Sequence, residues 1–285
     1  MPGTLKISLD TTKYRKPTEA EIKQAKDYVL RMSEYSDLLG GKVMDVLHEA
    51  AERIVRICYK YNIRPKDFQF SANLQMRREV YQVMDEAEEE ILAMMEEWAT
   101  KCADNKADKK LLLAWILLLG RNGKGLVATL EDKMRQFLYD LEAQIAAQKM
   151  SGHDQAKAVQ RVLATLTSVY AAPEMKKAFL RPLDAAAYYI RERGVHHGNF
   201  GQSSSGANNI VQMARTTLEM TWQKNLQMRF ERQDAVGYLQ LRGSSYICDI
   251  CDAETGFHEG TEGIDEAPMV HPNCRCYRVP VYKKI

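Results

Sequence analysis

The chain has 285 residues, of which 45% are apolar and 27% charged, and its net charge is +2. This composition is ordinary for a globular protein and excludes a low-complexity or collagen-like chain. A balance so close to neutrality also argues against a whole-chain polyanion binder. The first 21 residues lack the apolar stretch of a secretory signal, so we expect synthesis in a cytoplasm.

Helical patterns dominate the first 190 residues. Thr18 followed three residues later by Glu21 predicts a capping box at the start of a helix, and Gly40-Gly41 predicts its end. A second helix is predicted before Arg64-Pro65. Its apolar stripe comprises Val43, Leu47, Ala50, Ile54, Ile57 and Tyr61.

A third helix carries a short seam of the coiled-coil type, in which apolar residues alternate at spacings of four and three. The seam comprises Val80, Met84, Ala87, Ile91, Met94 and Trp98. The acidic run 85–90 lies on the same helix and is predicted to be its solvated face.

The longest apolar run, Leu111 to Leu119, is half the length needed to cross a bilayer. We therefore interpret it as a buried core helix and expect no membrane partner. The sequence GRNGKG at 120–125 lacks the Lys-Ser/Thr ending of a phosphate-binding loop and is predicted to be a turn between helices. One face of the helix after it comprises Leu126, Leu130, Met134, Phe137 and Leu141.

The composition changes at a Gly- and Ser-rich stretch, 194–209, which contains His196-His197 and has no apolar period. Before it we predict helices at about 154–169 and 174–193, and after it a helix at about 209–233. Alternating patterns then predict a strand-turn-strand over 236–248 and a returning strand over 276–284, which Pro280 restricts to a sheet edge or a bulge. The predicted organisation is a helical region, 1–193, the loop 194–209, and a small α+β module, 210–285. The expected fold is mainly α, with long helices and a zinc-pinned C-terminal module.

Four of the six cysteines lie near the C-terminal end, as a C-x-x-C pair, Cys248 and Cys251, and a C-x-C pair, Cys274 and Cys276. Two such pairs can supply the four corners of a structural zinc site. The segment between them, 252–273, is polar and has little apolar surface to bury, so a metal would help to hold it. His271 or His258 could replace one sulfur.

Three other interpretations of these cysteines stay open. Disulfides, or reduced thiols without a metal, are the main alternative. A thioredoxin-like redox site would need a βαβ pattern around C-x-x-C. A deaminase zinc site would need His-x-Glu followed by Pro-Cys-x-x-Cys, whereas here His258 and Glu259 are adjacent and the later segment is PNCRC.

The segments RTTLEM, VGYLQLRGS, CDICDAETG and HPNCRCYRVPV together resemble the phage Mu F-like minor head proteins, also called the head morphogenesis family. The resemblance covers about 208–281, with Arg215, Gly256, Pro272 and the four cysteines at matching places. The acid that normally follows Arg-Thr is Thr217 here, and Glu219 comes two positions later.

The resemblance implies a non-enzymatic minor component of a tailed-phage head. It implies association with portal and capsid proteins, weak contact with DNA, and location in the virion or, during assembly, in the bacterial cytoplasm. Arg215 and Arg275 are candidate structural or partner-contacting residues, and the seam-like helix faces suggest a homo-oligomer.

Two other functions remain as alternatives. A toxin-like nuclease or ADP-ribosyltransferase would have only poor stand-ins for its catalytic groups in Arg193, the serines 203–205, Glu259 and Glu262. A zinc-containing DNA-binding protein would need a surplus of basic residues. Residues 210–285 hold nine basic and ten acidic residues, a net charge of −1.

Overall fold

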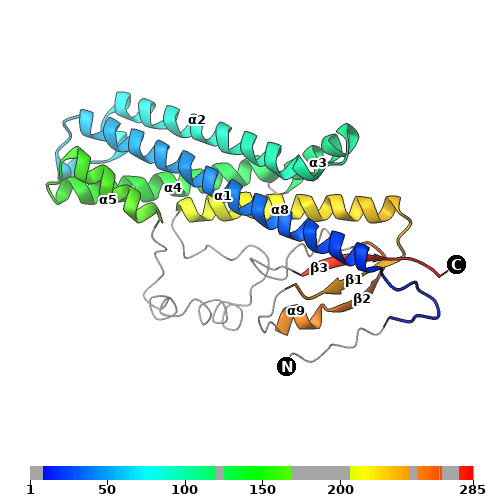
Figure 1. Cartoon of the computed structure of the whole chain (residues 1–285). Coiled ribbons are helices and arrows are strands. Elements are labelled where there is room, and N and C mark those ends of the chain that lie inside the picture. Colours follow the sequence, from blue (N-terminus) through cyan, green and yellow to red (C-terminus); the bar gives the residue numbers. More distant parts are fainter. Residues whose placement is uncertain are drawn as a thin grey trace. The chain divides into compact units, whose positions relative to one another are not determined.

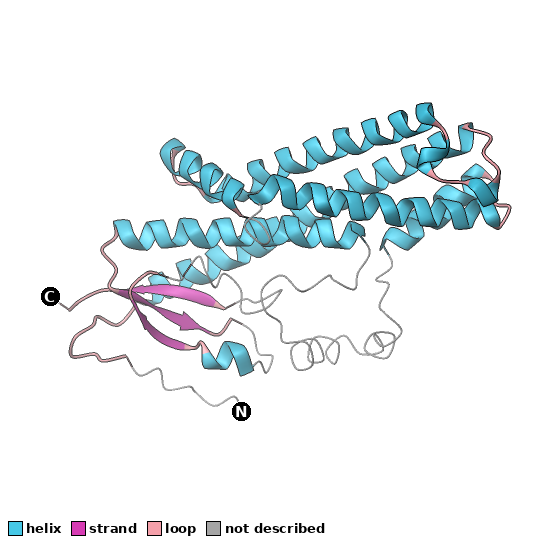
Figure 2. Ribbon diagram, turned by 180° about the vertical axis from the view of Figure 1, so that it is seen from behind, coloured by secondary structure: helices cyan, strands magenta, loops and turns pink. Residues whose placement is uncertain are grey.

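The computed structural model describes residues 9–119, 125–167, 206–243, 249–262, 264 and 276–284. The described chain is mainly helical, with one small antiparallel sheet near its C-terminal end (Figures 1 and 2). The coarse prediction of a mainly α fold with a small C-terminal sheet is therefore confirmed. The α-helices are α1 (Glu19–Lys60), α2 (Leu74–Ala99), α3 (Lys106–Leu118), α4 (Gly125–Met150), α5 (Gln155–Thr167), α8 (Gly206–Arg232) and α9 (Asp249–Ala253). Single 3₁₀ turns are η1 (Pro65–Asp67), η2 (Phe70–Ala72) and η3 (Thr100–Cys102), and the strands are β1 (Gly237–Leu241), β2 (Gly256–Glu259) and β3 (Tyr277–Val281).

The chain divides into two compact units. Unit 1 comprises Met1–Asp37, Ala99–Leu113 and Thr217–Ile285, and unit 2 comprises Leu38–Trp98 and Ala114–Thr216. The sheet belongs to unit 1, and α2, α4 and α5 belong to unit 2. The predicted helix 174–193 and most of the Gly/Ser-rich stretch lie outside the described residues; α8 begins at Gly206, three residues before its predicted start.

The start of α1 has the predicted capping box. The backbone N–H of Glu21 donates to Thr18 Oγ1 at 3.2 Å, and the backbone N–H of Thr18 donates to Glu21 Oε2 at 2.7 Å. Arg15 adds an ion pair to the same carboxylate group at 2.6 Å. Two N–H groups that a helix start leaves without partners are thus satisfied reciprocally.

Gly40-Gly41 does not end the first helix, contrary to the prediction, because α1 continues through both glycines to Lys60. The residues on either side, Leu39 and Val43, are fully buried. Burial of this continuous apolar face outweighs the roughly 1 kcal/mol helix penalty of each glycine.

In unit 2 the α2 seam differs from its prediction in its last two turns. Val80, Met84, Ala87 and Ile91 are buried as predicted, but burial then passes to Met95 and Ala99. The predicted residues Met94 and Trp98 are half-buried. From Ile91 onward the buried positions on α2 are spaced four residues apart. A straight helix has 3.6 residues per turn, so its buried side gradually moves away from positions that repeat every 3.5 residues. The predicted inner face of α4 is fully confirmed.

The apolar run on α3 is only partly buried, which corrects the prediction of a core helix. Leu112 and Ile116 have no exposed surface, but Leu111 is 60% exposed and Leu118 is 78% exposed. A helix that packs along one side buries only the residues on that side, so an unbroken apolar run leaves leucines on the outside.

The sheet of unit 1 has the strand order β2-β1-β3, and both pairings are antiparallel (Figure 2). All five residues of β1 are buried, so both faces of the central strand are covered. Pro280 lies on β3 at one edge of the sheet, as predicted. Strand β2 falls within the segment predicted to be a coreless loop, and Ile264 just after it is fully buried. Backbone hydrogen bonds and apolar burial therefore hold part of that segment.

The core of unit 1 mixes apolar and polar groups along α8. Trp222 packs between Tyr28 and Tyr35, with ring centroids 5.3 and 5.4 Å away. The Tyr28 hydroxyl donates to the Trp222 carbonyl at 2.6 Å, and the Asn225 amide donates to the Cys102 carbonyl at 2.9 Å. These two hydrogen bonds join segments that are distant in sequence and fix the part of α8 from Thr217 onward within unit 1.

Candidate functional site

The antiparallel sheet brings the two cysteine-bearing segments to the same end. Leu241, the last residue of β1, pairs with Tyr277, the first residue of β3, and Cys276 immediately precedes Tyr277. Gly256, the first residue of β2, pairs with Gln240 at the same end. Helix α9, which carries Cys251, leads directly into β2. Helix α9 with Cys251 therefore lies between β1 and β2 in the chain, and Cys276 lies at the entry of β3; Figure 1 labels α9 and the three strands.

Helix α9 is fastened to this end of the sheet by an ion pair. Arg242, just after β1, contacts Asp252 of α9 through Nη1 and Oδ1. The Thr255 hydroxyl donates to the Cys251 carbonyl at 2.7 Å, closing the end of the helix. Cys251 is only 2% exposed. Its thiol is thus part of a packed structure on the short helix α9.

Two of the five predicted metal ligands, Cys251 and Cys276, lie among the described residues, the second of them half-buried. Cys248, His271 and Cys274 lie outside the described residues. In the described part of the chain, no group of three or more His, Cys, Asp or Glu side chains is placed to hold a metal ion. The fit to zinc therefore rests on the chemistry of thiolate ligands and on the topology that brings Cys251 and Cys276 to one end of the sheet.

Arg278, two residues after Cys276, joins three segments of unit 1. It is 6% exposed. Its Nε donates to Gln240 Oε1 of β1 at 3.0 Å, and its Nη1 donates to Gln223 Oε1 of α8 at 2.5 Å and to the Ile264 carbonyl at 3.3 Å. The guanidinium group thus fixes the start of β3 against its neighbours.

Sequence reasoning assigned such an orienting role to Arg275, which lies outside the described residues, and missed Arg278. The available signal was weak. A strand that contains proline is expected at an edge, where an arginine is ordinarily exposed.

Arg215, the other arginine predicted from the motif, belongs to unit 2. Its guanidinium lies against the backbone of α1 at Gly40, and the residue is half-buried. The side chain therefore packs within unit 2, and its role in partner contact stays a prediction.

Unit 1 contains a cluster of arginine-carboxylate pairs that joins α8 to the segment before and within α3. Arg229 binds Asp104 through Nε at 2.8 Å. Arg232 binds Asp104 at 2.9 Å and the nearly buried Asp108 at 2.7 Å. Each carboxylate is neutralised by a guanidinium, as expected for a structural network.

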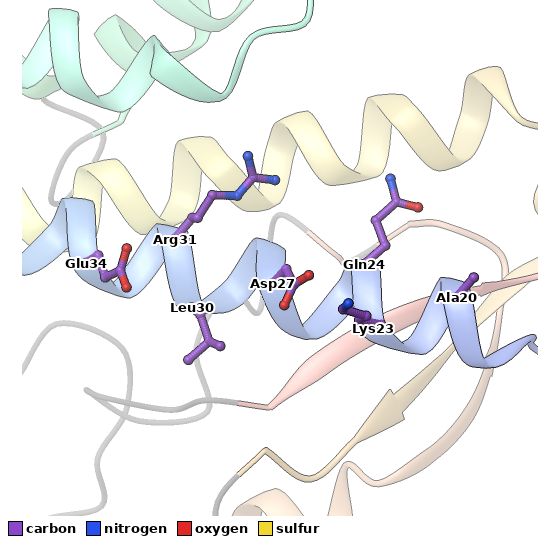
Figure 3. Close-up of a pocket in the computed structure, with 7 residues that line it drawn as sticks. All are labelled: Ala20, Lys23, Gln24, Asp27, Leu30, Arg31 and Glu34. Atoms are coloured by element: carbon purple, nitrogen blue, oxygen red, sulfur yellow. The ribbon is translucent and has the colours of Figure 1, made fainter.

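The pocket drawn in Figure 3 is a shallow groove along one helix. Its described lining residues all belong to α1, namely Ala20, Lys23, Gln24, Asp27, Leu30, Arg31 and Glu34. Figure 3 shows Arg31 and Gln24 on the opposite side of the helix from Leu30. A groove with this described lining does not have the concave, converging walls of a small-molecule site.

Of the stand-ins for enzyme groups, only two glutamates lie among the described residues. Glu259 and Glu262 are both exposed. Arg193 and the serines 203–205 lie outside the described residues, as do His196 and His197. No helix among the described residues is long and apolar enough to span a bilayer.

Comparisons with protein families, with curated proteins and with solved structures find no match to this chain.

Proposed function

We propose that this chain is a minor capsid or head morphogenesis protein of a tailed phage or prophage, acting as a non-enzymatic assembly component. The proposal is carried by one structural relationship within the module that has the motif resemblance. Cys251, on α9 before β2, and Cys276, just before β3, lie at the same end of the three-stranded sheet. Such convergence is what a structural metal clip at this end would require.

The resident metal in this proposal is a structural zinc ion. Cys248, Cys251, Cys274 and Cys276 would hold it, or His271 in place of one sulfur. Bound zinc supplies a cross-link between two chain segments and no redox chemistry. The residues of the chain complete the arrangement: Arg242 holds α9 by its ion pair with Asp252, and Arg278 holds β3.

A module fastened in this way suits docking on a larger assembly, because a rigid surface loses little conformational entropy on binding. We propose portal and capsid proteins as its partners. Its net charge of −1 is consistent with at most weak DNA contact. The protein would then be found in the virion head and, during assembly, in the host cytoplasm.

Co-expression tests this proposal directly. The chain is produced with the portal and major capsid proteins encoded beside it, and particles are purified by density gradient. We expect the chain to sediment with the particles, and a chain lacking 237–284 to be left in the soluble fraction. Absence of the intact chain from particles would overturn the proposal. Nuclease or NAD-consuming activity that disappears in Glu259→Gln/Glu262→Gln would favour the enzyme alternative, and salt-sensitive duplex binding would favour the DNA-binding one.

A further inference from the structure

Helix α3 carries an exposed stripe that changes from basic to apolar along its length. We call Lys106, Lys110, Ala114 and Leu117 the α3 stripe; all four are exposed. Their spacings of four, four and three residues place them along one side of the helix. Leu117 is 46% exposed and its neighbour Leu118 is 78% exposed. A helix end with neighbouring exposed leucines is a typical protein-contact feature.

Helix α2 carries an exposed stripe with the complementary order. We call Leu74, Tyr81, Asp85 and Glu89 the α2 stripe; spacings of seven, four and four residues place them along one side of α2. Leu74 is 63% exposed and Tyr81 is 43% exposed. From the N-terminal to the C-terminal end of its helix, the α2 stripe changes from apolar to acidic. In the same direction, the α3 stripe changes from basic to apolar.

The charged ends of the two stripes match when the helices run antiparallel. Lys106 and Lys110 are four residues apart, as are Asp85 and Glu89. Each pair therefore spans about 6 Å along its helix. Antiparallel alignment places Lys106 beside Glu89 and Lys110 beside Asp85. Within the described chain none of these four side chains has an ion-pair partner, so their charges remain available to another molecule.

The apolar ends match in the same alignment. Ala114 then faces Tyr81, and a small residue opposite a ring lets two helices approach closely. Leu117 then lies opposite the space between Tyr81 and Leu74, where its side chain can pack into the groove between them. The alignment therefore satisfies charge and shape together.

We infer that the α3 stripe of one copy docks antiparallel on the α2 stripe of a second copy of this chain. Each contact uses the α3 stripe of one copy and the α2 stripe of the other. Made reciprocally by two copies it closes a two-fold dimer, and made in one direction only it builds rings or open chains. The inference builds on the proposed assembly role, since a head component acts in several copies. Self-association is measured on the purified chain alone, so its result is independent of the co-sedimentation experiment. Either of the two proposals can fail while the other holds.

Charge reversal with rescue tests this inference. Sedimentation velocity is measured over a wide range of concentrations for the parent chain, for Lys106→Glu/Lys110→Glu and for Asp85→Lys/Glu89→Lys. We expect the parent to self-associate and each double variant to raise the dissociation constant by about tenfold or more. An equimolar mixture of the two double variants should recover hetero-association, because the lysines introduced on α2 of one chain would then meet the glutamates introduced on α3 of the other.

A matched control is Lys157→Glu/Arg161→Glu on α5, where both residues are exposed and four apart. This control should associate like the parent, and Leu117→Ser/Leu118→Ser should weaken association without altering the helical circular-dichroism signal. A parent that remains monomeric at all concentrations would overturn the inference. So would association that tolerates both reversals, or reversals that the mixture fails to rescue. Loss of capsid-protein binding by the α3 variants, with self-association unchanged, would assign the α3 stripe to a different partner.

Discussion

The guanidinium group of Arg215 lies directly against the backbone of Gly40. A β-carbon on Gly40 would lie 3.0 Å from Arg215 Cζ and closer still to Nε, whereas a β-carbon on Gly41 would meet nothing within 4 Å. The two adjacent glycines therefore have different structural roles within one helix. Gly40 makes room for an arginine, and Gly41 carries only the conformational cost of glycine.

This difference predicts opposite effects of two neighbouring substitutions. Gly41→Ala should stabilise the protein by about 0.5–1 kcal/mol, because alanine is the better helix former. Gly40→Ala should destabilise it, since Arg215 must leave its place. In an Arg215→Ala background, Gly40→Ala should become stabilising. Urea unfolding of the four variants in a double-mutant cycle measures this coupling; additive effects of the two changes would contradict the prediction.

Features of the helices could be predicted from the sequence where they depend only on residues close together in the chain. The Thr18-Glu21 box and the inner face of α4 are properties of short sequence windows, and both appear as predicted. The continuation of α1 through Gly40 was not predictable, because it depends on burial against residues distant in sequence. The exposure of Leu111 and Leu118 was also missed, since an unbroken leucine run does not reveal which side packs.

The arginine at the centre of the sheet gives a second prediction. Arg278→Met should lower the free energy of unfolding by about 2–3 kcal/mol, because three buried acceptors on Gln223, Gln240 and Ile264 would lose their donor. Arg278→Lys should recover only part of the loss, since an ammonium group lacks the planar fork. Chemical denaturation measures both variants.

The control for Arg278 is Arg135→Met on α4, where the side chain is 68% exposed. It should change stability by less than about 0.5 kcal/mol. Equal losses at the two positions would show that the Arg278 hydrogen bonds contribute nothing specific.

The sheet end shows what sequence could establish about the candidate site. Cysteine spacing singled out the two segments, and the pairing of β1 with β3 brings them to one end. Strand β2 was not predicted, because Phe257 is the single strongly apolar residue in GFHE. Arg278 was missed because its role depends on partners on α8 and near Ile264, which no local pattern reveals.

Glu88 on α2 gives a prediction about pH. Burial, together with the neighbouring carboxylates of Glu131 and Asp85, raises the pKa of Glu88 above its ordinary value of 4.5. The folded state therefore binds this proton more tightly than the unfolded state does. The stabilising contribution of the protonated form is complete below the unfolded pKa, and it is lost as pH rises through the folded pKa.

At pH 7 the charged Glu88 is thus unfavourable, and Glu88→Gln should stabilise the protein. Because the group is partly exposed, we expect a few tenths of a kcal/mol. The gain should disappear near pH 4, and Glu90→Gln, at an exposed position on the same helix, should not reproduce it. Thermal unfolding from pH 4 to 8 measures the difference, and a gain that does not change with pH would contradict the assigned cause.

The proposed zinc site gives the last prediction. The purified chain should contain one zinc per molecule, and Cys251→Ser should lower this content because it removes a thiolate ligand. Cys58→Ser is the matched control. Burial raises the pKa of the Cys58 thiol to about 12, so this cysteine stays protonated and should not bind the metal.

The structure also limits which part of the module should respond to loss of zinc. Strand β2 is paired with β1, and Ile264 is buried, so these residues retain support of their own. Protease cleavage in Cys251→Ser should therefore concentrate in 265–275, between the buried Ile264 and Cys276, while β2 stays protected. The helical circular-dichroism signal should be unchanged. Parent-like cleavage in this segment, or zinc content unaffected by Cys251→Ser, would remove the metal from the proposed function and leave hydrogen bonds and packing to hold the module.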